Sequence, residues 1–303
     1  MTSQLKNGFQ GLIAAVFTPL HSDGSLRLAQ VPTLVDHLVA QGVTGIFVCG
    51  STGEGPLLSS AERRRVAEAY VTAAKGRLRT IVHVGHDSLA EASGLAEHAA
   101  GIGADAIAAL PPGYFRCDSV DSLINWLGEI SRHAPSLPLY YYHIPTMSGH
   151  SFDVAELLEK ASTALPALKG IKYSATDLAK LHQCIEISKG RYDLYFGVDE
   201  MLLGAVAIGA NGAVGSTYNF AAPLYLEMIQ AYCAGDVDHA RRLQARAVQM
   251  VSIFSRYRGL PAIKATMKLA GIDCGPNRLP LRTLTAGELE QLKAELIQLE
   301  LLS

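Results

Sequence analysis

The sequence predicts an α/β fold: a (β/α)8 TIM barrel followed by a C-terminal appendage of about three helices. From residue 11 to about residue 220, short apolar, β-branched or aromatic runs alternate with Ala-, Leu- and Glu-rich segments of helical period. Eight such runs, spaced about 20–35 residues apart, fit eight parallel strands that each lead into a helix. The runs are almost continuously hydrophobic, as expected of parallel strands buried on both faces.

The expected strands are bounded by residues that fit strand ends. Pro138 opens the fifth strand and Pro145 closes it, where a missing N–H disrupts no ladder. A doubly wound open sheet is the alternative, but the segment VFTPLHSDG after the first strand lacks the glycine fingerprint of that fold. The eight expected strands cover residues 11–19, 45–51, 79–86, 104–112, 137–145, 168–175, 192–199 and 212–219.

Helical patterns separate the strands and continue alone beyond residue 233. The last expected helix opens with Thr285 and Glu288, which fit a capping box. We therefore expect one domain over residues 1–303, with the barrel at 11–233 and a helical extension at 234–303. The expected helices cover residues 27–41, 59–75, 88–101, 119–133, 153–162, 177–188, 200–209, 221–233, 236–257 and 260–271, with the last opening at 285.

Composition and charge point away from a nucleic-acid partner. The 303 residues are 49% hydrophobic and 18% charged, with a formal net charge of −2, which is ordinary for a globular enzyme. The longest basic run, Arg63-Arg64-Arg65, lies in a helical pattern. We interpret it as a solvated helix face rather than a patch that binds a polyanion.

Cysteine spacing and the N-terminal segment bear on the compartment. The five cysteines are scattered and odd in number, which fits neither a disulfide framework nor a zinc site. The segment MTSQLKNGFQ lacks the apolar stretch of a signal peptide, and no run of eighteen apolar residues offers a membrane span. These features predict a cytoplasmic protein with reduced thiols and no membrane partner.

Lys172 is the first candidate for chemistry. Barrel enzymes place their active sites at the carboxyl ends of the strands, and Lys172 comes late in the sixth expected strand. A sheltered amine at the barrel mouth can form a Schiff base with a ketone. An ordinary surface lysine at a strand end is the alternative. Lys169 should face the other way, nearer the closed end of the barrel.

The loop GSTGEG, residues 50–55, follows the second expected strand. Its glycines allow a tight turn whose backbone N–H groups converge, a nest suited to a carboxylate. Ser51 and Thr52 would add hydroxyl donors. A plain strand-to-helix turn explains the pattern equally well, and the loop matches no nucleotide-binding motif.

Three consecutive tyrosines end the fifth expected strand. Alternation sends Tyr140 and Tyr142 to one face and Tyr141 to the other, where it would pack in the core. Tyr142, nearer the mouth, is placed to transfer protons beside Lys172. Tyr114, just past the fourth strand, is a further candidate, although a tyrosine in a loop is commonly a packing residue.

Two acids and a serine follow the last two expected strands. Asp199 and Glu200 come after the seventh strand and Ser216 ends the eighth, a set that suits a polyhydroxylated ligand. Capping of the next helix is a strong alternative for Asp199. His83 and His86, three residues apart on a strand, should point to opposite faces, so we expect no metal. The residues together favour imine chemistry on a keto acid without metal, nucleotide or other cofactor.

Five segments, in this order, resemble the N-acetylneuraminate lyases: GSTGEG, YYHIPTMSG, GIKYS, GVDE and GAVGSTYN. These enzymes belong to the pyruvate-dependent class I aldolase superfamily that includes dihydrodipicolinate synthase. The resemblance runs from about residue 11 to near the C-terminus. It implies reversible retro-aldol cleavage of N-acetylneuraminate (sialic acid) to N-acetylmannosamine and pyruvate, through a Schiff base on Lys172.

The resemblance also implies roles for single residues and an assembly. Tyr142 would relay protons near the substrate carboxylate, which Ser51 and Thr52 would hold. Tyr114 would complete the hydroxyl relay in a neighbouring subunit of a homotetramer, although its setting, PPGY, departs from the family's more aromatic run. Contacts to the hydroxyl tail of the sugar would come from Ser174, Gly197, Asp199, Glu200 and Ser216.

Two other functions fit parts of the pattern. Dihydrodipicolinate synthases carry an arginine shortly after the fifth-strand proline, but the segment TMSG at 146–149 has none, so the clamp for a second carboxylate is missing. A catalytically silent barrel that senses sialic acid or a keto acid is the other alternative. The joint presence of Lys172, Tyr142 and Ser51 argues against it.

Overall fold

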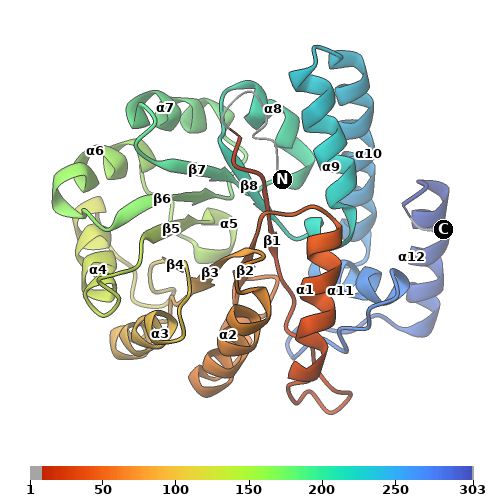
Figure 1. Cartoon of the computed structure of the whole chain (residues 1–303), viewed down its shortest axis with the longest axis horizontal. Helices are drawn as coiled ribbons and strands as arrows, with labels where there is room; N and C mark the ends of the chain where they lie inside the picture. Colours follow the sequence, from red (N-terminus) through yellow and green to blue (C-terminus); the bar gives the residue numbers. More distant parts are fainter. Residues whose placement is uncertain (1–8, 302–303) are drawn as a thin grey trace.

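A closed barrel of eight parallel strands forms the centre of the computed structural model, which describes residues 9–301 (Figure 1). Each strand pairs with its neighbours in sequence, and β1 pairs with β8 to close the sheet. The predicted barrel is therefore confirmed, and the open-sheet alternative is wrong. The strands are β1 (Leu12–Ala15), β2 (Gly45–Val48), β3 (Arg79–His83), β4 (Ala106–Ala109), β5 (Leu139–His143), β6 (Leu168–Tyr173), β7 (Asp193–Phe196) and β8 (Gly212–Gly215).

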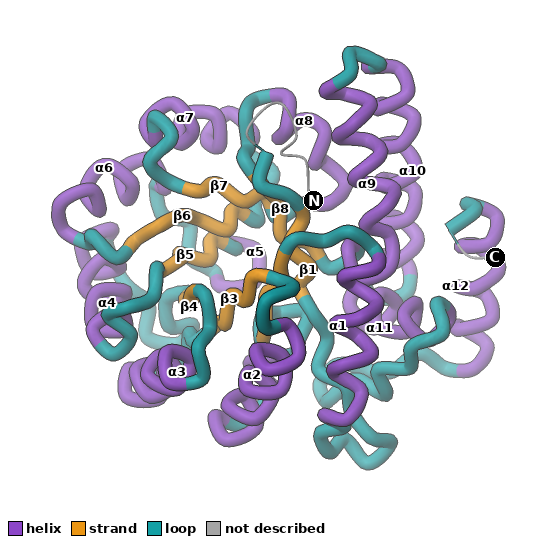
Figure 2. Tube along the Cα trace, viewed as in Figure 1, coloured by secondary structure: helices purple, strands orange, loops and turns teal. Residues whose placement is uncertain are grey.

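Helices surround the strands as an outer layer (Figure 2). Two features differ from the sequence prediction: a short helix follows β5, and the helix expected after β7 begins as a 3-10 turn. The elements of this layer are η1 (Leu28–Gln30), α1 (Val31–Ala40), η2 (Gly55–Leu57), α2 (Ser60–Ala74), α3 (Leu89–Gly101), α4 (Val120–Arg132), α5 (Pro145–Ser148), α6 (Val154–Ala164), α7 (Leu178–Ser188), η3 (Asp199–Met201), α8 (Leu202–Ala207) and α9 (Tyr218–Cys233).

The three predicted C-terminal helices are α10 (Val237–Arg256), α11 (Leu260–Leu269) and α12 (Ala286–Gln298). The predicted capping box of Thr285 and Glu288 opens α12. Helix α10 runs beside α9 (Figure 1), and apolar residues of α10 and α12 belong to the same buried cluster as the barrel helices. Because the extension shares this core, we propose that the chain folds as one domain.

Strand alternation places the side chains of the barrel interior as predicted. Tyr140 and Tyr142 lie inside the barrel, and Tyr141 packs outside against the helices. At the closed end, Arg79 donates hydrogen bonds to the hydroxyls of Tyr140 (2.6 Å) and Tyr195 (2.8 Å). Tyr140 in turn donates to Asp193 at 2.6 Å, so buried polar groups at this end satisfy one another.

Arg63 corrects one sequence interpretation. We expected the basic run at 63–65 to form a solvated helix face, but Arg63 is only 3% exposed and points into the protein. Its guanidinium donates to the backbone oxygens of His83 and Gly85, which end β3 and follow it. Residues 64 and 65 are less buried, as a helical period requires.

None of the helices within residues 9–301 combines the length and apolar character needed to cross a membrane.

Candidate active site

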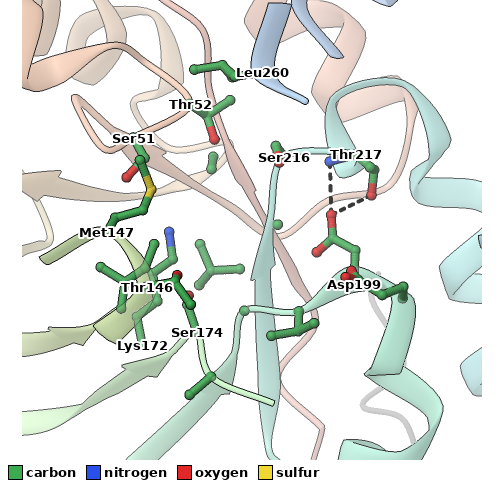
Figure 3. Close-up of a pocket in the computed structure, with 18 of the residues that line it drawn as sticks. Ser51, Thr52, Thr146, Met147, Lys172, Ser174, Asp199, Ser216, Thr217 and Leu260 are labelled. Carbon is green, nitrogen blue, oxygen red and sulfur yellow. Dashed lines mark hydrogen bonds between the residues drawn. The ribbon is translucent and has the colours of Figure 1, made fainter. Parts of the chain in front are cut away.

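A cavity of about 490 Å³ opens at the carboxyl ends of the strands (Figure 3). Its lining includes most of the predicted site residues, brought together from β5, β6 and the loops after β2, β7 and β8. Figure 3 shows Ser51 and Thr52 on one side of the cavity, and Asp199 with Thr217 on another. The predicted residues among the lining are Ser51, Thr52, Tyr142, Lys172, Ser174, Gly197, Asp199, Glu200 and Ser216.

Lys172 is sheltered inside the mouth, so the surface alternative is wrong. The residue is 5% exposed, and its Nζ lies 4.1 Å from the ring centroids of both Phe47 and Tyr142. No acidic side chain of the described residues forms an ion pair with it. Lys169, by contrast, is exposed, as alternation predicted. Contact with two aromatic faces holds the amine in place while leaving its nitrogen free of a carboxylate partner.

Tyr142 and Ser51 lie beside the lysine. Tyr142 is the direct partner of Lys172 in the pairing of β5 with β6, and its hydroxyl lies 3.3 Å from Ser51 Oγ. Two hydroxyls within hydrogen-bond distance can pass a proton between them, because each is both donor and acceptor. The arrangement therefore joins an amine, a phenol and an alcohol at one wall of the cavity.

The loop that carries Ser51 and Thr52 folds as a tight turn. Gly55 comes so close to Cys49 that a β-carbon would lie 1.9 Å from the Cys49 backbone oxygen, so only glycine fits. Glu54 adopts the left-handed conformation, with φ 55°. The turn brings Thr52 into a buried position on the cavity wall.

A buried ion pair fixes this loop to the C-terminal extension. Glu54 accepts a hydrogen bond of 2.6 Å from Lys264 of α11, and both side chains are 1% exposed. The backbone N–H of Arg278 donates to the other oxygen of Glu54 at 2.7 Å. Because burial penalises the charged form, the pKa of Lys264 is lowered from its ordinary value, while the charge of Glu54 opposes that shift.

The extension also contributes directly to the cavity. Val251 of α10 and Leu260 and Ile263 of α11 are among its lining residues. Sequence reasoning treated these helices as an appendage and missed this role, because nothing in their periodicity tells where they dock. Thr146 and Met147 of α5 also line the cavity and were missed for a similar reason: the four-residue helix is too short for a periodic signal.

Asp199 is buried and only partly satisfied. Its Oδ2 accepts hydrogen bonds from the backbone N–H (3.1 Å) and the hydroxyl (2.6 Å) of Thr217, whereas Oδ1 has no hydrogen-bond partner among the described residues. Burial raises the pKa of Asp199, and the bonds from Thr217 oppose the shift. Asp199 does not cap α8, so the capping interpretation is wrong. Burial likewise raises the pKa of Glu200.

Tyr114 lies apart from this cluster within the chain. It is 82% exposed, contacts Phe115 edge to face with centroids 5.1 Å apart, and does not line the cavity. The two histidines do not lie together. His83 points into the barrel beside Tyr142, while His86 lies in the loop beyond β3. Within residues 9–301, no three His, Cys, Asp or Glu side chains are grouped so that they could hold a metal ion.

Comparison with known proteins agrees with the barrel fold and identifies the family. The model of the dihydrodipicolinate synthetase family matches residues 8–299. The chain belongs to this family. Among curated relatives, N-acetylneuraminate lyase of Xenopus tropicalis is 40% identical over 298 residues, covering 97% of each chain. The human N-acetylneuraminate lyase is 41% identical over 303 residues, covering 98% of this chain and 95% of the relative.

Solved structures extend the comparison to the fold. N-acetylneuraminate lyase of Proteus mirabilis superposes with a TM-score of 0.93 at 40% identity, covering 96% of this chain and 99% of the other. Dihydrodipicolinate synthase of Cyanidioschyzon merolae, with lysine bound, superposes with a TM-score of 0.90 at 27% identity, covering 98% and 100%. Both branches of the family thus share the fold, and the Proteus mirabilis lyase shares more of the sequence with this chain than the Cyanidioschyzon merolae synthase does.

Proposed function

We propose that this protein is an N-acetylneuraminate lyase, a carbon–carbon lyase of the class I aldolase type. The observation that carries the proposal is the amine of Lys172, enclosed between the rings of Phe47 and Tyr142 at the barrel mouth and unpaired with any acid in residues 9–301. An amine in this position can attack a ketone carbon and form an imine. The likeness to lyases from frog and human, near 40% identity over almost the full chain, supports the same reaction.

The chemistry follows from the residues around Lys172. Its Nζ bonds to C2 of the open-chain sugar acid, and the protonated imine withdraws electrons from the C3–C4 bond. When the C4 hydroxyl loses its proton, that bond breaks and N-acetylmannosamine leaves. The remaining enamine takes up a proton at C3, and hydrolysis releases pyruvate. Tyr142 and Ser51, 3.3 Å apart, are the pair placed to carry these protons.

Charge at the cavity wall favours a polyol over a second carboxylate. Among the described lining residues, Lys172 is the one cationic side chain, whereas Asp199 and Glu200 are both acidic. Asp199 Oδ1, a buried acceptor without a partner, can accept a hydrogen bond from a sugar hydroxyl. Arg116 lies near Gly149 but is exposed and does not line the cavity, which supports the view that the synthase clamp is missing. Ser174, Gly197 and Ser216 would contact the same hydroxyl tail.

The substrate carboxylate would bind at the loop of Ser51 and Thr52, two hydroxyl residues that line the cavity. We further infer a cytoplasmic homotetramer that needs no cofactor beyond the lysine imine. Tyr114 supports the assembly, because an aromatic pair that is more than 80% exposed is unusual on a free surface. In a tetramer Tyr114 would reach the hydroxyls of Ser51 and Tyr142 in the neighbouring subunit.

Borohydride reduction in the presence of pyruvate tests the mechanism. We expect a stable adduct whose peptide mass maps to Lys172; no adduct, or an adduct elsewhere, would contradict it. Release of N-acetylmannosamine from N-acetylneuraminate then tests the substrate. An enzyme that forms the adduct but releases no N-acetylmannosamine, while turning over another keto acid, would be a different aldolase of the family.

A further inference from the structure

Asp199 Oδ1, an acceptor, and His83 Nε2 are among the buried side-chain polar atoms that have no hydrogen-bond partner in the described chain. The proposed function uses the first and leaves the second unexplained. His83 is 3% exposed and lies on β3, with its ring inside the barrel. A buried imidazole nitrogen without a partner is destabilising, so its presence calls for a reason.

The His83 ring packs on the two rings that enclose the lysine amine. Its centroid lies 5.8 Å from that of Tyr142 and 6.1 Å from that of Phe47. Its Nε2 lies 3.0 Å from the position that a β-carbon on Gly85 would take, so glycine leaves room on that side of the ring. The ring is therefore part of the wall that holds Lys172.

Arg63 sets the proton position on this ring. One nitrogen of its guanidinium donates to the His83 backbone oxygen at 2.6 Å and lies 3.4 Å from His83 Nδ1. A guanidinium can only donate, so Nδ1 acts as acceptor and the ring proton resides on Nε2. Burial, with the charges of Arg63 and Lys172, lowers the pKa of His83 well below its ordinary value, which keeps the ring neutral. The result is a fixed, uncharged N–H donor.

We propose that His83, fixed by Arg63, is a positioning residue for the imine chemistry: its Nε2–H holds the water molecule that imine formation releases and imine hydrolysis consumes. This inference rests on the proposed function. In the forward direction the amine adds to the ketone, and the carbinolamine loses its hydroxyl with one proton as water. Overall, one ketone and one ammonium give one protonated imine and one water, so His83 only donates a hydrogen bond and transfers no proton.

Oxygen exchange between water and pyruvate measures this step directly. Each cycle of imine formation and hydrolysis replaces the C2 oxygen of pyruvate with one from the solvent. The rate of ¹⁸O incorporation above the uncatalysed rate therefore measures how fast water leaves and re-enters the reaction. Two variants form a matched pair. His83→Gln keeps an acceptor for Arg63 and an N–H donor near the Nε2 position, whereas His83→Met has similar length and no donor.

We expect His83→Gln to exchange oxygen within about threefold of the wild-type rate and His83→Met to exchange about tenfold more slowly, the effect of one lost hydrogen bond. The loss should fall on the maximal rate and not on the KM for pyruvate. Equal exchange rates in the two variants would overturn the inference. If the His83 ring had only a structural role, both variants would lose that role and both rates would fall by the same factor. If wild-type protein exchanged no oxygen and formed no borohydride adduct, the proposed function itself would fail.

Discussion

Both ends of the barrel contain buried polar side chains, but these side chains have hydrogen-bond partners at the closed end and lack some of them at the mouth. At the closed end, Arg79, Tyr140, Asp193, Tyr195 and Gln10 form a hydrogen-bond network in which each side chain has a partner. At the mouth, Lys172 forms no ion pair with any described residue, and Asp199 Oδ1 and His83 Nε2 have no hydrogen-bond partner in the described chain. The closed end is complete without a ligand and the mouth is not.

This difference separates stability from function along single strands. Tyr140 and Tyr142 lie two residues apart on β5 and point the same way, yet one joins the satisfied network and the other contacts the Schiff-base candidate. Unpaired buried groups are costly, and natural folds tolerate them mainly where a ligand will meet them. The comparison therefore predicts which substitutions change activity and which change stability.

The largest effect is expected from Lys172→Met. Losing the nucleophile removes covalent catalysis, so kcat should fall on the order of 10⁴-fold or more, and borohydride should trap no pyruvate. Steady-state kinetics with N-acetylneuraminate measures the loss. The matched control is Lys169→Met on the same strand, which should change kcat by less than about twofold because Lys169 is exposed. A Lys172→Met enzyme that kept a tenth of its activity would break the comparison.

The two tyrosines of β5 give the sharpest comparison. Tyr142→Phe should lower kcat by about 10²–10⁴-fold, because it removes a proton-transfer group, with little change in melting temperature. Tyr140→Phe should keep its activity and lose about 1–3 kcal/mol of unfolding free energy, because Arg79 and Asp193 each lose a partner. Kinetics and calorimetry on both variants check the pair. Equal losses of activity in Tyr142→Phe and Tyr140→Phe would contradict the division of roles between the two ends of the barrel.

Glu54→Gln tests the ion pair that fixes the loop at residues 50–55, the proposed site for the substrate carboxylate. Leaving Lys264 buried beside a neutral amide should cost about 3 kcal/mol, or about 6 °C in melting temperature, and should raise the KM for pyruvate. The double variant Glu54→Gln/Lys264→Met should recover most of the stability, because no charge is then left unpaired.

The control for this pair is Glu62→Gln. The Glu62–Arg278 pair is 20–25% exposed, so its loss should cost less than about 1 kcal/mol. Equal losses from Glu54→Gln and Glu62→Gln would mean that burial of the ion pair has no bearing on its effect.

The smallest effect is a gain in stability from Asp199→Asn. Burial raises the pKa of Asp199, so its stabilising contribution is complete below the unfolded-state pKa and is lost as pH rises through the folded-state value. At pH 7 the charged form therefore destabilises the fold, and Asn should raise the melting temperature by about 2 °C while weakening sugar binding. The gain should vanish below about pH 4, where Asp199 is neutral.

Asp193→Asn at the closed end is the counterpart. Its carboxylate accepts hydrogen bonds from Gln10 and Tyr140, so the amide should destabilise the protein and leave sugar binding unchanged. Melting curves at pH 7 and pH 4, with KM for N-acetylneuraminate, distinguish the two variants. A loss of stability in Asp199→Asn at pH 7 would contradict the assignment.

The sequence by itself determined what depends on near neighbours in the chain. Apolar periodicity predicted eight strands and the helices around them, alternation separated Tyr141 from Tyr140 and Tyr142, and the spacing of Thr285 and Glu288 predicted a capping box. Even the position of Lys172 followed from its place in a strand, because a barrel fixes where strand ends lie. Each of these signals involves residues close together in the sequence, so the geometry of a single helix or strand is enough to interpret it.

Only the tertiary structure decided which distant residues meet. Glu54 and Lys264 are separated by 210 positions, and neither residue carries a local signal of the other. Arg63 lies in an ordinary helical pattern, and its burial against His83 depends on how α2 docks on β3. From the sequence, Asp199 fits a helix cap. In the structure, its carboxylate instead accepts a hydrogen bond from Thr217, in the loop after the next strand. Closing the barrel sets these distances, because pairing β1 with β8 fixes every loop at the mouth relative to all the others.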